Sequence, residues 1–327
     1  MVPLSKLHKH ISVPIWYLSI FIFFMASVSL SKKILIFDNK EQVLSKGLYF
    51  LAILMSLRFL LSVIQRVQSD ALVLFLLSLF IFALFYKKES LAGLSLASAS
   101  MVKLTPLIFL PFLLLRKKIK TAASCVFFIL FYAFIPSVYV GQSRNILYLK
   151  NWFLVHQKNP PDYLLWYKNQ SLLSCLLRFL TKDSEVNILN LGQTAVFTIF
   201  IVLAVILFSL IFILYRKTYS AASGFSYLAE ISLILICMIL FSPLAWKHTF
   251  VYLIIPHLVL LFYVFYINPQ DKITRALLTV SFILNTILNP EITRSFAKIF
   301  QLYSHITFGT LILYAALLRV NYKLCKP

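Results

Sequence analysis

A lysine lies in the middle of an apolar run of the chain. Residues 98–117 read SASMVKLTPLIFLPFLLLRK, with Lys103 three residues before Pro106. A charge at the centre of a bilayer costs about 2.5–3.5 kcal/mol on insertion scales, so a membrane segment rarely keeps one without a use. A lysine ammonium can meet a phosphate as a point charge. We therefore ask whether Lys103 receives a phosphate or only reaches to a lipid headgroup.

Three other stretches carry polar groups that suit a phosphate and a sugar, because cations and amides stand beside aromatic rings. The stretch QRVQSD (65–70) holds Arg66, Gln68 and Asp70, and SPLAWKHTF (242–250) holds Trp246, Lys247 and His248. The long segment 141–193 contributes Tyr167, Asn169, Gln170, Ser171 and Arg178. An arginine can grip a phosphate with two parallel hydrogen bonds. Taken singly, Arg178 also fits an interfacial anchor and His248 a structural histidine.

The composition identifies a membrane protein. Of 327 residues, 61% are hydrophobic and 13% are charged, and the mean hydropathy is +0.89. Soluble domains carry about 25% charged residues. We therefore predict an all-α polytopic membrane protein, with residues 1–327 forming a single integral membrane domain.

The net charge of +21 indicates either an anionic binding partner or a role of the basic residues in membrane topology. The basic residues punctuate the apolar runs, and no basic stripe stands apart from them, so we expect no nucleic acid. Membrane topology and contacts with anionic membrane lipids explain them better. The four cysteines are far apart and none has metal-ligand spacing, so we expect no disulfide, no metal and no cofactor.

Apolar runs predict about eleven transmembrane or short membrane helices. Nine lie near 11–30, 47–65, 71–86, 121–140, 194–214, 225–243, 249–267, 274–288 and 300–318. The segment 92–115 lies between two basic clusters that both favour the cytoplasm. It must therefore cross an even number of times, as two short helices that meet at Lys103. The N-terminus is then outside and the C-terminus inside, and the outer face receives all the polar stretches above, with 141–193 as a long loop containing interfacial helices.

Three segments resemble one family of membrane enzymes. LAGLSLASASMVKLTPLIFLPFLLLRKKIKTA, KNQSLLSCLLRFL and SPLAWKHTFVYLIIPHLVLL are similar, in order, to motifs of glycosyltransferase family 87, whose members resemble polyprenol-phosphate-mannose-dependent mannosyltransferases. The resemblance implies a GT-C-type membrane bundle. It also implies a hexosyltransferase that moves a sugar, mannose in the family, from a polyprenyl-phosphate-linked donor to a lipid or glycan acceptor on the extracytoplasmic face.

The resemblance also assigns roles to residues. Donor and phosphate binding would fall to four cationic groups, Lys103, Arg178, Lys247 and His248. Sugar and acceptor binding would fall to Gln68, Tyr167, Asn169, Gln170 and Trp246. The family's catalytic carboxylate lies in an outer loop after a first helix, and this chain begins at the helix that should follow. We therefore expect an N-terminal helix and catalytic loop to be missing, with Asp70 as the substitute base.

Two other functions fit a multi-helix membrane protein. One is a transporter or flippase of lipid-linked sugars, although such proteins favour ionisable residues at the bilayer midplane and inverted repeats, neither of which this sequence shows. The other is a non-catalytic remnant that binds polyprenyl phosphates. In each case we expect an integral protein of the inner or plasma membrane of a bacterial cell.

Overall fold

The chain is a bundle of helices. The computed structural model describes residues 7–37, 45–157, 161–218, 224–288 and 290–324, and within these ranges the chain forms helices and turns but no strand. The first half consists of α2 (Lys9–Leu35), α3 (Lys46–Gln65), α4 (Asp70–Phe85), α5 (Glu89–Val102), η1 (Thr105–Ile108), α6 (Phe109–Leu115), α7 (Ile119–Phe134) and α8 (Ser137–Val140). The second half consists of α9 (Gln142–Gln157), α10 (Pro161–Leu165), α11 (Leu172–Leu180), α12 (Gln193–Thr218), α13 (Gly224–Leu240), η2 (Lys247–Leu253), α14 (Ile254–Phe262), η3 (Tyr263–Ile267), α15 (Lys272–Phe282), η4 (Ile283–Ile287), α16 (Pro290–Thr293), η5 (Arg294–Phe296), α17 (Ala297–Leu302) and α18 (His305–Leu324).

The upright helices confirm an all-α membrane protein but not the number of crossings. Each segment predicted to enter the membrane coincides with a helix or with a run of consecutive helices. Five helices of the described chain are long and apolar enough to cross a membrane, or six if the bent pair Arg294–Leu302 and His305–Leu324 counts as one span. The prediction of about eleven membrane helices is therefore not confirmed as a count of crossings.

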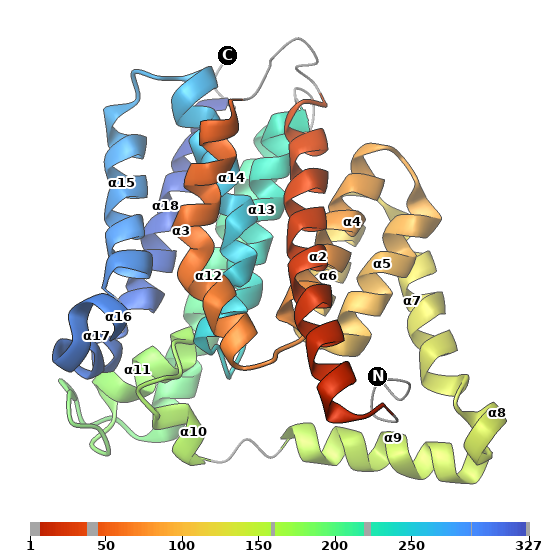
Figure 1. Ribbon diagram of the computed structural model, residues 1–327. Helices are drawn as coiled ribbons and strands as arrows, with labels where there is room; N and C mark the ends of the chain where they lie inside the picture. Colours follow the sequence, from red (N-terminus) through yellow and green to blue (C-terminus); the bar gives the residue numbers. More distant parts are fainter. Residues whose placement is uncertain (1–6, 38–44, 158–160, 219–223, 289, 325–327) are drawn as a thin grey trace.

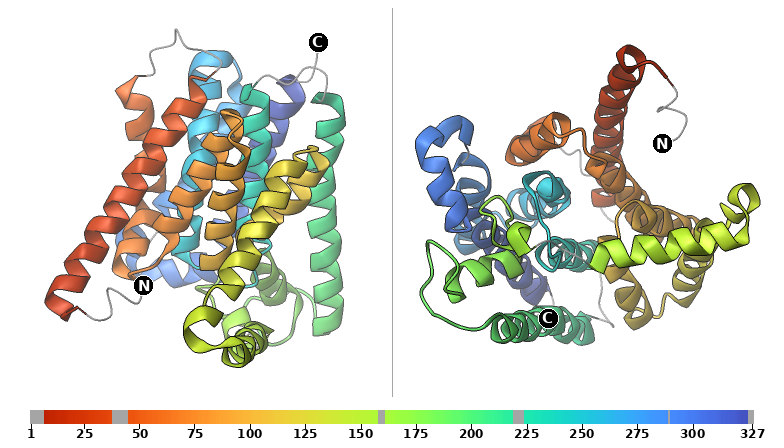
Figure 2. Two further views of the ribbon diagram at one scale, coloured as in Figure 1. Left: turned by 90° about the vertical axis from the view of Figure 1, so that its right-hand side faces the viewer. Right: turned by 90° about the horizontal axis from the view of Figure 1, so that it is seen from below.

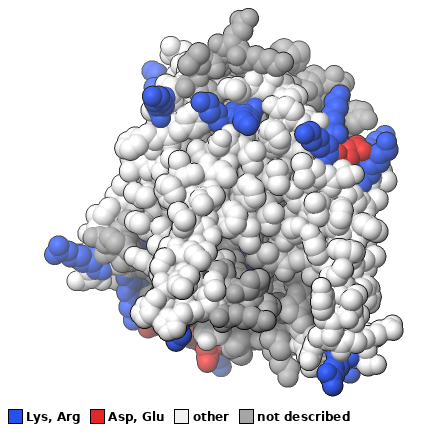
Figure 3. All heavy atoms as spheres, turned by 45° about the vertical axis from the view of Figure 1, so that its right-hand side comes forward, with Lys and Arg blue, Asp and Glu red and all other residues white. Residues whose placement is uncertain are grey.

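The bundle has two different ends (Figures 1 and 2). Helices α2, α4 and α18 end toward the upper end of Figure 1, whereas α9, α10, α11, α16 and α17 gather at the lower end. Most of the lysines and arginines visible in Figure 3 lie toward these two ends, with a broad uncharged band between them. Such a band suits the hydrocarbon layer of a membrane.

The helical structure is interrupted at Lys103, as the sequence predicts. Helix α5 ends at Val102, Lys103 has an extended backbone (φ −143°, ψ 138°), and the chain then re-enters the bundle through η1 and α6. Pro106 favours the break, because it has no backbone N–H to donate to the carbonyl of Val102 and its ring would clash with that carbonyl in a continuous α-helix. Lys103 therefore lies at a turn between two short helices rather than inside one.

Close packing holds α5 in place. A Cβ atom added at Gly93 would lie 2.5 Å from the Cβ of Ser124 and 2.7 Å from the backbone nitrogen of Cys125, both in α7. Only glycine allows the two backbones to approach this closely. The helix that carries Lys103 at its end is thus packed tightly against its neighbour.

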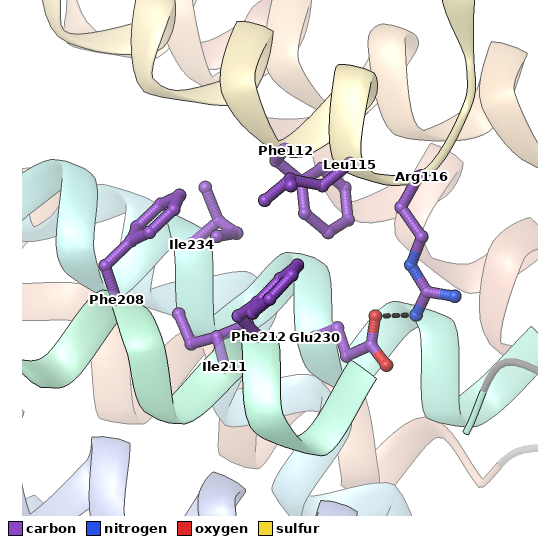
Figure 4. A pocket seen from close by; sticks show the side chains of 8 residues that line it. All are labelled: Phe112, Leu115, Arg116, Phe208, Ile211, Phe212, Glu230 and Ile234. Atoms are coloured by element: carbon purple, nitrogen blue, oxygen red, sulfur yellow. Dashed lines mark ion pairs between the residues drawn. The ribbon is translucent and has the colours of Figure 1, made fainter. Parts of the chain in front are cut away.

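A buried ion pair ties α6 to the central helix α13 at the end of the bundle away from Lys103 (Figure 4). Arg116, just after α6, pairs with the fully buried Glu230 of α13, and its guanidinium lies 5.0 Å from the ring centroid of Tyr227. Phe112, Phe208 and Phe212 stand around the pair and keep it in apolar surroundings. Breaking such a pair leaves an uncompensated buried charge.

We expect Glu230→Ala to destabilise the protein by about 3–5 kcal/mol, because Arg116 would keep its charge without this carboxylate. The double variant Arg116→Met/Glu230→Leu should recover most of the loss, because it removes both charges. Thermal unfolding in detergent measures both effects, with Asp183→Ala, at an exposed position, as the control. Equal stability of Glu230→Ala and the control would contradict this account.

Candidate functional site

Asp70 is the centre of a cluster of polar side chains. It is the first residue of α4 and is fully buried. The Nζ of Lys103 lies 2.7 Å from its Oδ1, and the hydroxyl of Tyr252 donates a hydrogen bond of 2.8 Å to the same oxygen. The other oxygen, Oδ2, has no hydrogen-bond partner and lies 3.9 Å from Nε2 of His248. One carboxylate oxygen is therefore held by two donors, and the other is turned toward the imidazole.

Three interruptions of helices bring this cluster together. Asp70 follows the turn between α3 and α4, and Lys103 occupies the break before η1. The stretch 242–246 is not helical, since Pro243 follows the end of α13, and it delivers His248 into the 3₁₀ turn η2. Tyr252 lies four residues after His248 in the same 3₁₀ segment, and both side chains reach Asp70.

A cavity of about 830 Å³ opens beside His248. Its volume is in the range of small-molecule sites. The lining residues come from α3 and the following turn, from the loop before α11, from η2, and from the segment between α15 and α17: Leu54, Leu57, Arg58, Leu61, Ser62, Gln65, Arg66, Trp166, Tyr167, Lys168, Trp246, Lys247, His248, Phe282, Thr286, Ile287, Ile292, Ala297, Lys298 and Gln301. Asp70 does not line the cavity, so His248 connects the cavity to the buried carboxylate.

The cavity wall changes from apolar to polar along α3. Leu54, Leu57 and Leu61 line it over two turns and are partly exposed, and they are followed by Ser62, Gln65 and Arg66. A ligand that follows this wall would have an apolar part beside the leucines and a polar part at the end of the helix. This arrangement fits an amphiphile.

The polar part of the cavity is cationic. Five lining residues are basic (Arg58, Arg66, Lys168, Lys247 and Lys298), and none of the described lining residues is acidic. Lys298 faces Glu185 outside the lining, at 3.7 Å, with both side chains largely exposed. A cavity walled by one sign of charge concentrates ions of the opposite sign. The expected ligand is therefore an anion.

Arg58 is the most deeply buried of these basic residues. It is 6% exposed, and its Nη1 donates to the backbone oxygens of Asn285 at 2.9 Å and Leu288 at 3.4 Å. Nη1 also lies 3.4 Å from Nε2 of His305, whose Nδ1 faces the carbonyl of Phe300 at 2.8 Å. Because a carbonyl can only accept, Nδ1 carries the proton and Nε2 accepts from the arginine. Arg58 is not among the residues predicted from the sequence, because there it is a single charge in an apolar segment.

Aromatic rings form another part of the wall. The centroids of Trp166 and Trp246 lie 5.2 Å apart at an interplanar angle of 75°, and Lys168 places its Nζ 4.8 Å from the centroid of Trp166. Edge-to-face pairs and cation–π contacts of this kind are stabilising. They hold the rings of Trp166, Tyr167 and Trp246 at the cavity as rigid flat surfaces.

Asn169, Gln170 and Arg178 lie elsewhere, inside the framework of the loop. All three are fully buried and contact protein rather than the cavity. Asn169 donates to the carbonyls of Tyr163 and Pro243 and accepts from the backbone N–H of Ala245. Gln170 donates to the carbonyls of Tyr167 and Gln301. Their contacts bind the loop to the chain after α13 and to α17.

Arg178 makes the densest set of these contacts. Its guanidinium donates to the carbonyls of Trp166, Asn169 and Leu302 and to the hydroxyls of Ser174 and Ser304, at 2.6–3.2 Å. Burial lowers its pKa to about 10, so the side chain stays protonated at neutral pH. The interpretation of Arg178 as an interfacial anchor is wrong, because the side chain has no exposed surface.

The remaining candidates divide between the cavity and its surroundings. Lys247, His248, Tyr167 and Trp246 line the cavity, whereas Gln68 lies in the turn after α3 and donates to the carbonyl of Arg66. Sequence reasoning missed Tyr252, Trp166 and Gln301. A signal existed for Tyr252, four residues after His248, but none marked Gln301.

The fold and the cavity define an all-helical membrane protein with a large cavity whose wall is apolar at one end and cationic at the other. The family model of glycosyltransferase family 87 matches residues 1–243, and the chain belongs to this family. It is therefore a membrane glycosyltransferase. No curated protein and no solved structure gives a significant match. Residues 244–327, which supply Trp246, His248 and Gln301, lie outside the matched range.

We expect Arg178→Lys to loosen the loop before α11. A lysine has three donors on a single nitrogen and cannot reproduce the five contacts of the planar guanidinium. Each lost hydrogen bond from a charged group costs about 1.5–3 kcal/mol. Limited proteolysis should cut within 161–192 much faster than in the native protein. Arg144→Lys on the exposed face of α9 is the matched control, and equal cleavage of the two variants would contradict a framework role.

Proposed function

We propose that this glycosyltransferase transfers a hexose, with mannose as the first candidate, from a polyprenyl-phosphate-linked donor to a lipid or glycan acceptor. The observation that carries the proposal is the cavity wall, which is leucine-rich at one end and cationic and aromatic at the other. A polyprenyl phosphate sugar has the same order of parts: an apolar tail, an anion and a polar ring.

The donor would enter with its tail along α3. Leu54, Leu57 and Leu61 offer apolar surface for the isoprenoid chain, and the basic side chains beyond them attract the phosphate. Lys247 lies in this basic part, while Lys103 is engaged with Asp70. We infer that Lys103 serves the phosphate while it stays paired with the carboxylate of Asp70.

The chemistry requires a base for the acceptor hydroxyl. In the proposed step, the acceptor oxygen attacks C1 of the sugar, the bond from C1 to the phosphate oxygen breaks, and polyprenyl phosphate leaves with the bonding electrons. The hydroxyl proton passes to the pair formed by His248 and Asp70, of which His248 faces the cavity. Attack opposite to the leaving group inverts the configuration at C1.

The loop contributes to the site by position. The hydrogen bonds of Asn169, Gln170 and Arg178 hold the stretch from Trp166 to Lys168 at the cavity. Tyr167 and Trp246 would then offer flat surfaces to a sugar. The distribution of basic residues along the sequence favours an extracytoplasmic position for this end of the bundle.

We expect Asp70→Asn to lower the rate of transfer by about 10²–10⁴-fold, the usual contribution of a general base. The amide can still accept hydrogen bonds from Lys103 and Tyr252, so the fold should persist. The measurement is transfer of labelled hexose from polyprenyl phosphate hexose by the purified protein in liposomes, with Asp162→Asn at an exposed position of α10 as the control.

Several results of this assay would reject the proposal. Full activity of Asp70→Asn would exclude Asp70 as part of the base. A native protein that moves the donor lipid between leaflets without transferring its sugar would be a transporter. A protein that binds polyprenyl phosphate and does neither would be a binding remnant.

We expect Lys103→Ala to abolish use of the donor, since both the phosphate and Asp70 lose their ammonium. Thermal unfolding in detergent measures the accompanying loss of stability from the buried carboxylate that it leaves without its cation. Combining Lys103→Ala with Asp70→Asn separates the two roles. If Lys103 only supports Asp70, the double variant will be no worse than Asp70→Asn, whereas a direct role toward the phosphate will add a further rise in KM for the donor. Retained transfer activity of Lys103→Ala would contradict a role of Lys103 in binding the donor phosphate.

A further inference from the structure

Gln301 presents a buried side-chain amide to the cavity. It lies in α17, is 4% exposed and lines the cavity wall, and its Oε1 is buried without a hydrogen-bond partner. The backbone oxygen of the same residue accepts from Nε2 of Gln170 at 2.9 Å. The main chain of Gln301 is thus fixed by a hydrogen bond, whereas the oxygen of its side-chain amide has no partner.

Such an amide points to a ligand. Buried polar groups in folded proteins are nearly always hydrogen-bonded, and an unsatisfied one costs about 1–3 kcal/mol. Other polar groups of the wall already have protein partners: Thr286 donates to the carbonyl of Met55 at 2.6 Å, and Nη1 of Arg58 donates to two carbonyls. A ligand that donates and accepts hydrogen bonds would satisfy Gln301.

The chemistry of the surrounding wall selects the kind of ligand. A carboxamide both donates and accepts, which matches neighbouring hydroxyl groups of a sugar, whereas a phosphate offers only acceptors and is better met by the basic residues. The rings of Trp166 and Trp246 line the same cavity and provide apolar faces for the C–H groups of a sugar ring. Amide and aromatic groups together are typical of carbohydrate recognition.

The position of Gln301 matches the polar end of the proposed donor. Helix α17 lies beside α11 at the lower end of the bundle in Figure 1. Helix α3 ends at the same end of the bundle, where Ser62, Gln65 and Arg66 follow its leucines. The hydrogen bond from Gln170 fastens α17 to the loop that carries Trp166. The amide therefore stands beyond the leucine wall, where the sugar of a lipid-linked donor would lie.

We propose that the carboxamide of Gln301 binds hydroxyl groups of the donor hexose and thereby sets which sugar the enzyme accepts. This inference rests on the proposed function. It adds a specificity-determining residue from the part of the chain beyond the family match. Discrimination by a buried group that hydrogen-bonds a substrate hydroxyl is strong, since a substrate without that hydroxyl leaves the group unsatisfied.

Equilibrium binding to the full chain in lipid nanodiscs tests the proposal with two probes, polyprenyl phosphate and polyprenyl phosphate mannose. The native protein should bind the glycosylated lipid more tightly. Gln301→Met, which keeps the length of the side chain and removes its polar atoms, should lose most of that difference, about 10-fold in Kd, and leave the affinity for the bare lipid phosphate unchanged. The control is Gln270→Leu, an exposed glutamine outside the cavity.

The outcomes separate the inference from the function. If the native protein binds neither probe, the proposed donor class is wrong. If Gln301→Met keeps the full difference between the probes, or weakens both equally, the role of Gln301 is wrong. Gln301→Glu retains an oxygen that accepts a hydrogen bond from a hydroxyl, so it should retain part of the difference in Kd between the two probes. If Gln301→Met fails to fold, Gln301→Ala and Gln301→Glu replace it. An unchanged mannose preference in Gln301→Ala, or loss of both affinities in Gln301→Glu, overturns the role.

Discussion

The structure depends on one ion pair between a buried carboxylate and a lysine. Asp70 has no exposed surface, and a lone carboxylate in such surroundings would be very costly. The ammonium of Lys103 at 2.7 Å makes its burial possible, and the hydroxyl of Tyr252 supports the same oxygen. To bring these groups together, the chain interrupts a membrane segment before Pro106 and starts α4 with an acidic residue. The remaining oxygen of Asp70 is thereby left facing His248.

The sequence predicts this region well because its signals are local. Pro106 and the basic clusters on both sides of 92–115 are sufficient to predict two short helices with Lys103 between them, and the structure has α5, η1 and α6 there. Asp70 was singled out as an acidic residue at a helix end. Its contact with Lys103 could not be predicted, because it depends on how α4 and α5 pack side by side.

The loop shows the limit of such reasoning. Asn169, Gln170 and Arg178 have residue types that suit a sugar or a phosphate, but residue type does not reveal whether a side chain faces a cavity or the backbone. Two of the five hydrogen bonds of Arg178, those to Leu302 and Ser304, join segments more than 100 residues apart, and no pattern in the sequence indicates which groups accept them. Gln301 is the converse case, an ordinary glutamine that becomes notable only through its burial beside a cavity.

The graded wall of α3 has a consequence for kinetics. Leu54, Leu57 and Leu61 are partly exposed and continue without a break into Ser62, Gln65 and Arg66. A lipid that follows this helix would arrive by lateral diffusion and would never leave the bilayer. The concentration that the enzyme meets is then the mole fraction of the donor among the membrane lipids. Dilution of the proteoliposomes in buffer should therefore leave the saturation of the enzyme with donor unchanged. Dilution of the donor with other lipids should lower it.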